Sequence, residues 1–464
     1  MIQTKEQLKQ VIDSQRAYFK TGETRPLTFR LSQLRRLKQV LKAYEQQLFD
    51  ALAKDLGKHP LESYMTELGL LYHHIDDMLK YLPKWDGRQR VNTPLFLFPA
   101  KSYTVNVPYG NTLILSAFNY PLLLSLDPLI GALAGGNTAL VALSEQTPHV
   151  SETLTAMISD CFPENYLAFY TGSIDMNTFV LAERFDKIFF TGSTRVGKIV
   201  LSAASQHLTP VTLELGGKSP AVVTKHADIR TAAERIAWGK CVNAGQTCVA
   251  PDYCLVDQEV QKELLSQLQE AVRRMYGEAV QSSPFFGRIV NRSALERLTA
   301  LIEADREFLV FGGTADAADS YVSPTILSAH ITTELASMRE EIFGPILPVL
   351  GYDELQQAID IINDGEAPLA FYPFSEQKNE QQHLLRAVQF GGATVNDTVL
   401  HLSNNHLGFG GVGSSGMGRY HGKDSFETFT HKQSILTRGT GIRLPLMYPP
   451  YTSKKEGIIR RFLG

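Results

Sequence analysis

The stretch DKIFFTGSTRVGKIVLSAAS, residues 186–205, combines an apolar run, a turn of small residues and an amphipathic segment. The run KIFFTG is short and bounded by glycine, which predicts a buried strand. The segment RVGKIVLSAAS predicts a helix, and Gly192, Ser193 and Thr194 form the joint between them. Free backbone amides at the start of a helix attract phosphate groups, although a plain strand-to-helix turn explains this joint equally well.

The same alternation continues on both sides of this stretch. Short apolar runs alternate with helical segments at 112–118, 138–143, 166–170, 186–192 and 209–217. A second series extends from AVVTK at 221–225 to GGATVN at 391–396. Such alternation predicts doubly wound α/β architecture, in which ligands bind beyond the carboxyl ends of parallel strands.

The amino-terminal part is predicted to be helical. Leucines at steps of three and four predict a helix over 27–56, with Gly57 as its stop. A second helix is expected from Glu62 to Leu82, because Pro83 should end it. The proline-rich residues 83–110 are expected to be an extended or crossing segment.

Composition excludes several classes of protein. The 464 residues are 44% hydrophobic and 20% charged, and the net charge of −3 argues against nucleic acid as a main partner. No apolar stretch is long enough for an integral membrane span, and the amino terminus lacks the apolar region of a secretory signal. Four cysteines do not make a disulfide framework, so we expect a cytoplasmic protein with reduced thiols. Whether the basic, partly apolar tail touches a membrane stays open.

The segment VNAGQTCVAPDYC, residues 242–254, raises the question of what Cys248 does. Cys241, Cys248 and Cys254 are not spaced as zinc ligands or as a C-x-x-C redox pair, so no metal site is predicted. A buried thiol and a nucleophile remain as alternatives, and burial is the commoner fate of a free cysteine.

Two glycine patterns imitate nucleotide motifs. GFGGVGSSG, residues 408–416, follows no clear strand, so we interpret it as a tight glycine loop. GSTRVGK, residues 192–198, resembles a P-loop, but Ile199 stands where Ser or Thr would bind magnesium.

Two polar residues at predicted strand ends extend the site. Glu214 precedes two glycines, and Asn119 precedes a proline; each could be a surface or capping residue. Together with Cys248 they supply a base, an amide donor and a nucleophile, the combination that acyl chemistry requires.

Five segments together resemble the NAD(P)-dependent aldehyde dehydrogenases over residues 5–450. They are FTGSTRVGKIV (190–200), VTLELGGKSP (211–220), NAGQTCVAPDY (243–253), EEIFGPILPV (340–349) and LGFGGVGSSGMGRYHGKDSFETFTHKQS (407–434). The resemblance is closest to the class 3 branch, of which MTELG (65–69), SAFNYP (116–121), GKDSFETF (422–429) and YPPY (448–451) are typical. The resemblance implies the aldehyde dehydrogenase fold, with a doubly wound coenzyme domain, an α/β catalytic domain and a small β arm.

The resemblance also implies roles for individual residues. Cys248 would attack the aldehyde carbon, Asn119 and the Cys248 N–H would bind the resulting oxyanion, and Glu214 would activate the hydrolytic water. The small residues before Cys248 would let the loop approach substrate and nicotinamide. The residues implied in cofactor binding are Gly192, Ser193, Thr194, Gly197, Glu145, Leu215, Glu341 and Phe343.

The chain departs from the family pattern at the adenosine site. The family has Lys-Pro-Ser-Glu there, whereas this chain reads ALSE, with Ala142 and Leu143 before a retained Glu145. A carboxylate without its lysine would repel a 2′-phosphate, so we expect NAD rather than NADP. Gly408 and Pro373 also differ from the family, with effects on the substrate entrance that the sequence does not define.

The resemblance implies a domain plan and an activity. Residues 1–82 and 108–211 would bind NAD, 212–420 would be catalytic, and 83–107 with 421–450 would form a homodimerisation arm, followed by a tail at 451–464. The expected reaction oxidises a medium- or long-chain aliphatic or an aromatic aldehyde to its acid. CoA-dependent thioester cleavage and a nucleotide-binding protein without activity are the alternatives, and the presence of Glu214 argues against the first.

Overall fold

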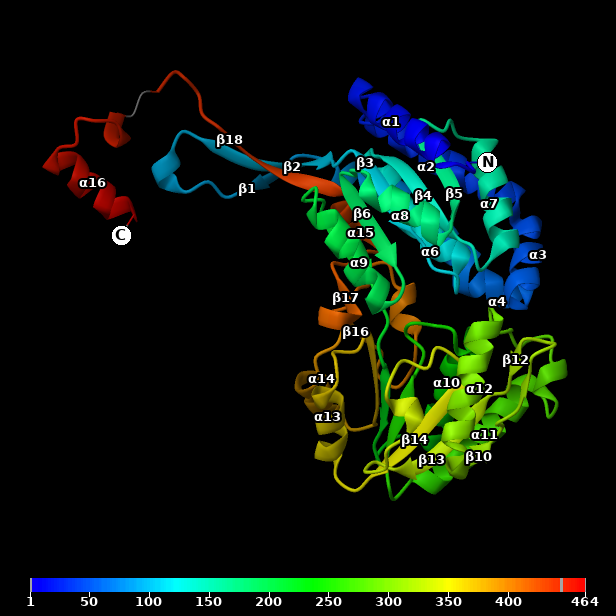
Figure 1. Cartoon of the computed structure of the whole chain (residues 1–464). Coiled ribbons are helices and arrows are strands. Elements are labelled where there is room, and N and C mark those ends of the chain that lie inside the picture. The colour runs from blue at the N-terminus through cyan, green and yellow to red at the C-terminus, as the bar shows by residue number, and fades with distance from the viewer. Residues whose placement is uncertain (1, 443–444, 464) are drawn as a thin grey trace.

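In the computed structural model, residues 2–442 and 445–463 are described, and they form two α/β lobes with a long arm (Figure 1). The first lobe contains a six-stranded sheet of order β17-β7-β6-β3-β4-β5, parallel except for β17. Its strands are β3 (Asn111–Leu115), β4 (Thr138–Ser144), β5 (Leu167–Gly172), β6 (Lys187–Thr191), β7 (Val211–Glu214) and β17 (Gly416–Met417).

Helices cover both faces of this sheet, as the alternating sequence predicts. They are α1 (Lys5–Thr21), α2 (Leu27–Ala43), α3 (Glu45–Leu56), α4 (Pro60–Ser63), α5 (Gly69–Trp85), α6 (Pro121–Gly135), α7 (Pro148–Ser159), α8 (Ile174–Ala182), α9 (Thr194–Ser205) and α15 (Gly422–Thr428). Helix α6 is buried along its whole length, which fits its almost entirely apolar sequence.

The second lobe contains a seven-stranded sheet of order β10-β13-β14-β9-β8-β15-β16, in which only β10 is antiparallel to its neighbour. Its strands are β8 (Pro220–Val223), β9 (Tyr253–Asp257), β10 (Leu309–Phe311), β13 (Thr325–His330), β14 (Ile346–Tyr352), β15 (Ala370–Phe374) and β16 (Gly392–Ala393). A separate hairpin pairs β11 (Ala315–Asp316) with β12 (Tyr321–Val322). The helices are α10 (Ile229–Cys241), α11 (Gln261–Tyr276), α12 (Arg292–Ala304), α13 (Leu355–Asp364) and α14 (Lys378–Ala387). The two sheets confirm the predicted doubly wound α/β class.

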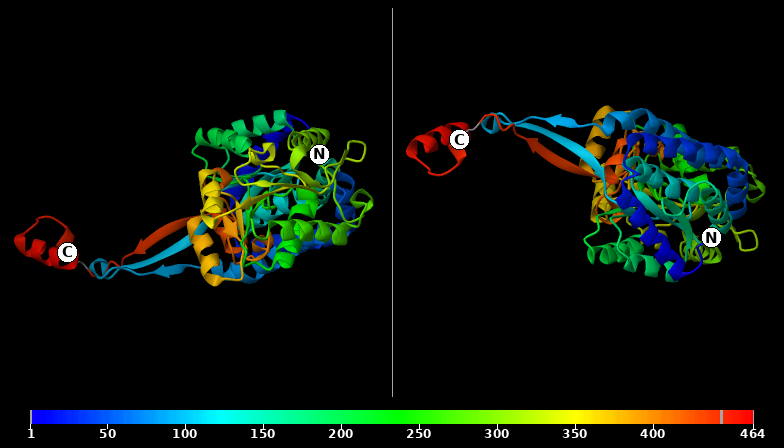
Figure 2. Two further views of the ribbon diagram at one scale, coloured as in Figure 1. Left: turned by 90° about the horizontal axis from the view of Figure 1, so that it is seen from below. Right: turned by 90° about the horizontal axis from the view of Figure 1, so that it is seen from above.

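The arm is a three-stranded antiparallel sheet that extends from the body (Figures 1 and 2). Its central strand β2 (Lys101–Pro108) pairs with β1 (Gln89–Val91) and with β18 (Thr430–Thr437). Helix α16 (Ser453–Leu463) lies at the far end of the arm, away from both lobes. Helix α15, by contrast, packs on the body against α5 and α6.

Two predicted helices have wrong boundaries. The helix expected over 27–56 is divided at Tyr44, whose φ of −100° and ψ of 5° change the direction between α2 and α3. The helix expected to end before Pro83 continues to Trp85. Its last turn is closed by a hydrogen bond from the Asp86 N–H to the Leu82 carbonyl, and Trp85 stacks on Phe426. Packing therefore outweighs the one bond that proline removes.

The glycine-rich residues 408–416 form a tight loop, as we interpreted them. A side chain at Gly411 would meet the backbone of Ser415, and β17 immediately after the loop pairs with β7. The pairing sets Gly416 opposite Glu214, so the loop lies beside the carboxyl end of β7.

Candidate active site

The junction between β6 and α9 forms one wall of a cavity at the carboxyl end of the first sheet. The Ser193 hydroxyl accepts a hydrogen bond from the Val196 N–H and so caps α9. Gly192 lies against Phe190, where a Cβ would be 2.6 Å from the ring. The cap and the lack of a side chain leave the start of α9 open to a ligand.

The cavity has a volume of about 500 Å³ and gathers most of the predicted site residues. Its lining includes Asn119, Gly192, Ser193, Glu214, Leu215, Cys248, Glu341 and Phe343. The cavity is also lined by Ser144, Gln146 and Arg195, which sequence reasoning missed.

Three predicted cofactor residues do not line the cavity. Thr194 turns its hydroxyl to the Ser414 carbonyl at 3.1 Å, and Gly197 makes room for Leu215, whose Cδ2 would lie 2.6 Å from a Cβ there. Glu145 is exposed just beyond β4, between the lining residues Ser144 and Gln146.

The loop before Cys248 is an unusual turn. Asn243 and Ala244 have φ of 54° and 51°, and Gly245 has φ of 74°. A side chain on Gly245 would collide with the backbone of Gly344, so this glycine admits the EIFGP loop. The lack of a side chain at Gly245 therefore serves close packing between two protein loops, and the approach of this loop to substrate and nicotinamide stays a prediction.

Cys248 is partly exposed at the end of this turn, unlike the buried Cys241 and Cys254. Burial of the thiol among protein atoms raises its pKa to about 12, and the carboxylates of Glu341 and Glu214 raise it further. The thiol is therefore protonated at neutral pH.

Two buried carboxyl groups face the same cavity. Glu214 is 3% exposed, and neither of its oxygens has a hydrogen-bond partner among the described residues. Burial raises its pKa well above the ordinary value for glutamate. Burial, followed by the nearby Asp252 carboxylate, raises the pKa of Glu341 to about 8. Buried carboxyl groups with raised pKa in a cavity are typical of sites of proton transfer and ligand binding.

A set of charged residues that sequence reasoning missed supports Glu341. Lys218 donates to Asp252 at 2.6 Å and to the carbonyl of Glu340 at 3.0 Å, while Asp252 accepts from the Ile342 N–H at 3.1 Å. These contacts fix both neighbours of Glu341. Lys218 lies in the LELGGKSP motif and Asp252 in the CVAPDY motif. Their place inside these motifs is the sequence feature that could have indicated a role in the site.

A second cavity, of about 190 Å³, meets the first at Cys248. Apolar and aromatic side chains dominate its lining, which includes Leu70, Leu123, Leu124, Trp238, Val399, Leu402 and Phe409. The two cavities share Leu124, Cys248, Phe409 and Tyr420, so the cysteine lies in a wall between the larger cavity, which is the more polar one, and the apolar one.

Comparisons with known proteins identify the family of this chain. The model of the aldehyde dehydrogenase family matches residues 2–435. The chain is 46% identical to the 4,4′-diaponeurosporen-aldehyde dehydrogenase of Staphylococcus aureus, over 96% of this chain and 97% of that protein. It is 40% identical to the dimeric NADP-preferring aldehyde dehydrogenase of Canis lupus familiaris, over 96% and 98% of the two chains.

A solved structure described as the substrate-bound state of Staphylococcus aureus AldH superimposes with a TM-score of 0.96 at 46% identity, covering 98% of this chain and 99% of that one. Among the helices of the described residues, none has the length and hydropathy needed to cross a membrane. The family match, the relatives and the shared fold agree, and the chain belongs to the aldehyde dehydrogenase family, class 3 branch, as an oxidoreductase.

Proposed function

We propose that this enzyme oxidises medium- or long-chain aliphatic or aromatic aldehydes to carboxylic acids with NAD, using Cys248 as the nucleophile. The position of Cys248 in the wall between the two cavities carries the proposal. An aldehyde entering through the apolar cavity would meet the thiol, and a cofactor in the polar cavity would meet it from the other side.

The residues of the polar cavity fit a dinucleotide. The open start of α9 suits a pyrophosphate, and the buried Glu341 Oε1 has no hydrogen-bond partner among the described residues, as expected of a group that binds ribose hydroxyls. When bound, NAD supplies the acceptor for the hydride that leaves the substrate carbon.

Each chemical step then has a residue beside it. The Cys248 thiol first releases its proton to water, and the thiolate sulfur then adds to the aldehyde carbon, so that the carbonyl oxygen becomes an oxyanion. The Asn119 amide has two N–H groups, of which one donates to the Gln246 carbonyl at 3.0 Å, so the other can donate to that oxyanion together with the Cys248 N–H. Loss of hydride from this adduct leaves a thioester on Cys248.

Hydrolysis completes the cycle. Glu214 takes a proton from water, the hydroxyl adds to the thioester carbon, and the carbon–sulfur bond breaks to release the acid and the cysteine. Because burial raises its pKa, Glu214 binds this proton more readily than an exposed carboxylate would. A water-activating carboxylate supports hydrolysis over transfer of the acyl group to CoA.

We further propose that the chain is a homodimer. The projecting arm offers for contact with a second copy the edge of β18 that faces away from β2, which pairs with no strand of the described residues, and a relative is named as dimeric. In this plan residues 1–82 and 108–211 bind cofactor, 212–420 carry catalysis, and 83–107 with 421–450 contribute the arm, although α15 within that last stretch packs on the body.

Purified enzyme with NAD and a panel of hexanal, decanal, benzaldehyde and acetaldehyde tests the proposal. We expect NADH absorbance and acid formation without CoA, with kcat/KM higher for decanal than for acetaldehyde because of the apolar cavity. Cys248→Ser should abolish NADH formation. Activity that survives this substitution would refute the cysteine mechanism, and an absolute requirement for CoA would refute hydrolysis.

A further inference from the structure

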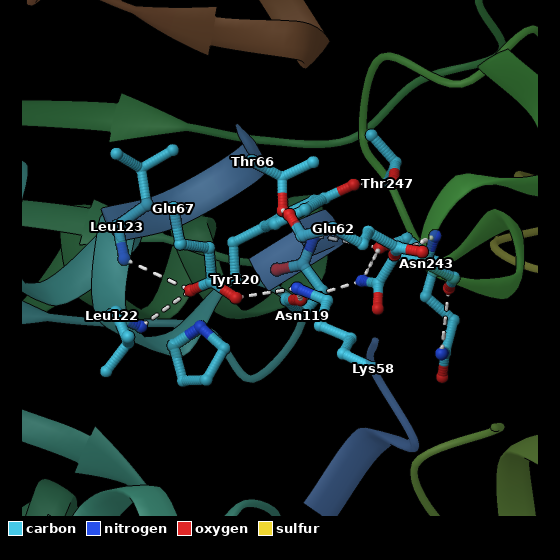
Figure 3. A network of polar contacts seen from close by, with 12 residues as sticks. Lys58, Glu62, Thr66, Glu67, Asn119, Tyr120, Leu122, Leu123, Asn243 and Thr247 are labelled. Atoms are coloured by element: carbon cyan, nitrogen blue, oxygen red, sulfur yellow. Dashed lines mark hydrogen bonds and ion pairs between the residues drawn. The ribbon is translucent and has the colours of Figure 1, made fainter. Parts of the chain in front are cut away.

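A buried polar network lies behind Asn119 and connects it to the Cys248 loop (Figure 3). At its centre is Lys58, 1% exposed, in the connection between α3 and α4. Its ammonium donates to Glu67 Oε1 at 2.6 Å and to the backbone carbonyl of Asn119 at 3.3 Å, and lies 4.1 Å from the centre of the Tyr120 ring. One cation therefore contacts both residues that open α6.

Glu67 extends this contact into α6. Its second oxygen, Oε2, accepts hydrogen bonds from the N–H groups of Leu122 at 2.8 Å and Leu123 at 3.3 Å. These are donors of the first helical turn, which no helical carbonyl can satisfy. The Lys58–Glu67 pair thus fixes the chain at Asn119 and at the first turn of α6 that follows it.

Asn243 joins the other end of the network to the nucleophile loop. Its Nδ2 donates to the Asn119 carbonyl at 2.7 Å and to the Gln246 carbonyl at 3.1 Å. Its own N–H donates to the Glu62 carboxylate at 2.9 Å. The Gln246 carbonyl also accepts a hydrogen bond from the Asn119 side-chain amide. Asn243 therefore bonds both the backbone carbonyl of Asn119 and the carbonyl that holds the Asn119 side chain.

A second link runs beside the first. The Tyr120 hydroxyl and the Thr247 hydroxyl share a hydrogen bond of 2.5 Å, between the residues that directly follow Asn119 and precede Cys248. The network therefore holds the amide donor and the nucleophile in one fixed relation, although they are separated by almost 130 residues of sequence.

We propose that Lys58 and Asn243 are positioning residues that set the Asn119 amide for the substrate oxygen. The inference rests on the proposed function, because it assigns to the network the orientation of the donor in that mechanism. A fully buried ion pair is expensive to desolvate and is often no more stabilising than apolar residues of the same size. Its contacts here go to the backbone of Asn119 and to the first turn of α6 that follows it. A donor aimed at a developing charge is effective only when its position is fixed.

The experiment is a double-mutant cycle on the holoenzyme with decanal. Single-turnover NADH formation is measured for Lys58→Met, for Asn243→Gly, and for each of them combined with Asn119→Ala. Glycine suits the positive φ at residue 243, so this variant removes the amide bridge without adding backbone strain. A Lys58→Met/Glu67→Gln variant avoids a lone buried carboxylate if Lys58→Met does not fold.

We expect each single variant to slow NADH formation by about 10- to 100-fold, because removal of an oxyanion donor costs about 10²–10³-fold and misplacement costs less. In the Asn119→Ala background the same changes should slow it by less than about twofold, since their route of action is already lost. The KM for NAD and the rate of Cys248 alkylation by iodoacetamide should stay within about twofold of the wild type, because neither depends on the amide donor.

Arg30→Met provides the matched control. Arg30 is a second buried cation, paired with Asp86 at 2.6 Å and bonded to the Ala134 carbonyl near the other end of α6. This variant should lower Tm but leave NADH formation unchanged. Equal losses with and without Asn119, or a loss in Arg30→Met, would overturn the positioning role. Full activity of Asn119→Ala alone would instead refute the donor role in the proposed mechanism.

Discussion

At the scale of single residues, the reactivity of Cys248 depends on its surroundings. Its pKa of about 12 arises from burial and from the Glu341 and Glu214 carboxylates. The reactive thiolate is therefore a minor species below that pH, and its fraction rises about tenfold for each unit of pH.

The first prediction follows from this titration. Alkylation of Cys248 by iodoacetamide in the cofactor-free enzyme should accelerate about tenfold per pH unit between pH 7 and 9. Peptide mass spectrometry separates Cys248 from the partly exposed Cys161, which serves as an internal reference. A rate at Cys248 that is constant over this range would show that the thiol is already ionised at neutral pH.

The second prediction concerns Glu145 and the choice of cofactor. Its exposed carboxylate follows β4, beside the lining residues Ser144 and Gln146, while Ala142 is buried and offers no cation. The wild type should have a higher kcat/KM with NAD than with NADP. Glu145→Gln should raise the NADP to NAD ratio of kcat/KM by about 5- to 10-fold, the scale of one unfavourable charge contact.

A matched variant sharpens this second test. Arg195 is the one lysine or arginine among the described residues that line the 500 Å³ cavity, and it could receive a 2′-phosphate. Arg195→Gln should lower the same ratio, in the direction opposite to Glu145→Gln. A wild type that uses NADP as well as NAD would contradict the argument from Glu145.

At the scale of elements, local patterns predicted what is determined locally. The strand–turn–helix of β6 and α9 was predictable because apolar runs and small turn residues select it without distant contacts. The break at Tyr44 and the extension of α5 through Pro83 could not be predicted in this way. The extension depends on the packing of Trp85 on Phe426, and these two residues are over 300 residues apart in the sequence.

The same division applies to the site. Cys248, Glu214 and Asn119 could be proposed from their places at element ends and from the resemblance. The Lys58–Glu67 pair gave no such signal, because a lysine and a glutamate in a helical region usually face solvent. Only the fold shows that both are buried and that their partners are the Asn119 carbonyl and the first turn of α6.

The third prediction concerns a strand that begins with a buried cation. Lys187, the first residue of β6, is 5% exposed and donates to the Thr212 hydroxyl at 2.8 Å. Burial lowers its pKa from 10.5 to about 8, so keeping it charged at pH 7 lowers the free energy of unfolding by up to ~3 kcal/mol. Lys187→Met should therefore raise the free energy of unfolding at pH 7 by about 1–3 kcal/mol.

The effect of Lys187 on stability depends on pH because its pKa differs between the folded and unfolded chain. Between pH 8 and 10.5 the unfolded chain binds the extra proton, so the wild type gains stability as pH rises through this window. The gain from Lys187→Met, measured by urea unfolding, should shrink over the same window. The exposed Lys20→Met is the control and should show no gain at either end. A loss of stability for Lys187→Met at pH 7 would mean that its contact with Thr212 outweighs the cost of burial.

At the scale of the whole molecule, the arm exposes apolar side chains and a strand edge. Val91 in β1 and Leu436 in β18 are 47% and 51% exposed, and at the far end the arm residues Leu95, Phe96 and Phe98 line a groove with α16. A long exposed edge invites pairing with another strand, and proteins usually cover or charge such edges. The arm is therefore the surface on which a second copy of the chain would bury apolar groups.

The last prediction tests this surface by mass. Light scattering at micromolar concentration should give twice the chain mass of 51.6 kDa. Val91→Lys/Leu436→Lys adds two charges to the arm and should raise the dimer dissociation constant at least tenfold, because burying an unpaired charge in an interface costs more than 1.4 kcal/mol. Ile174→Lys, at an 82% exposed position on α8 in the body, is the control and should remain dimeric. A wild type of single mass, or a control that dissociates as readily as the arm variant, would exclude the arm as the dimer contact.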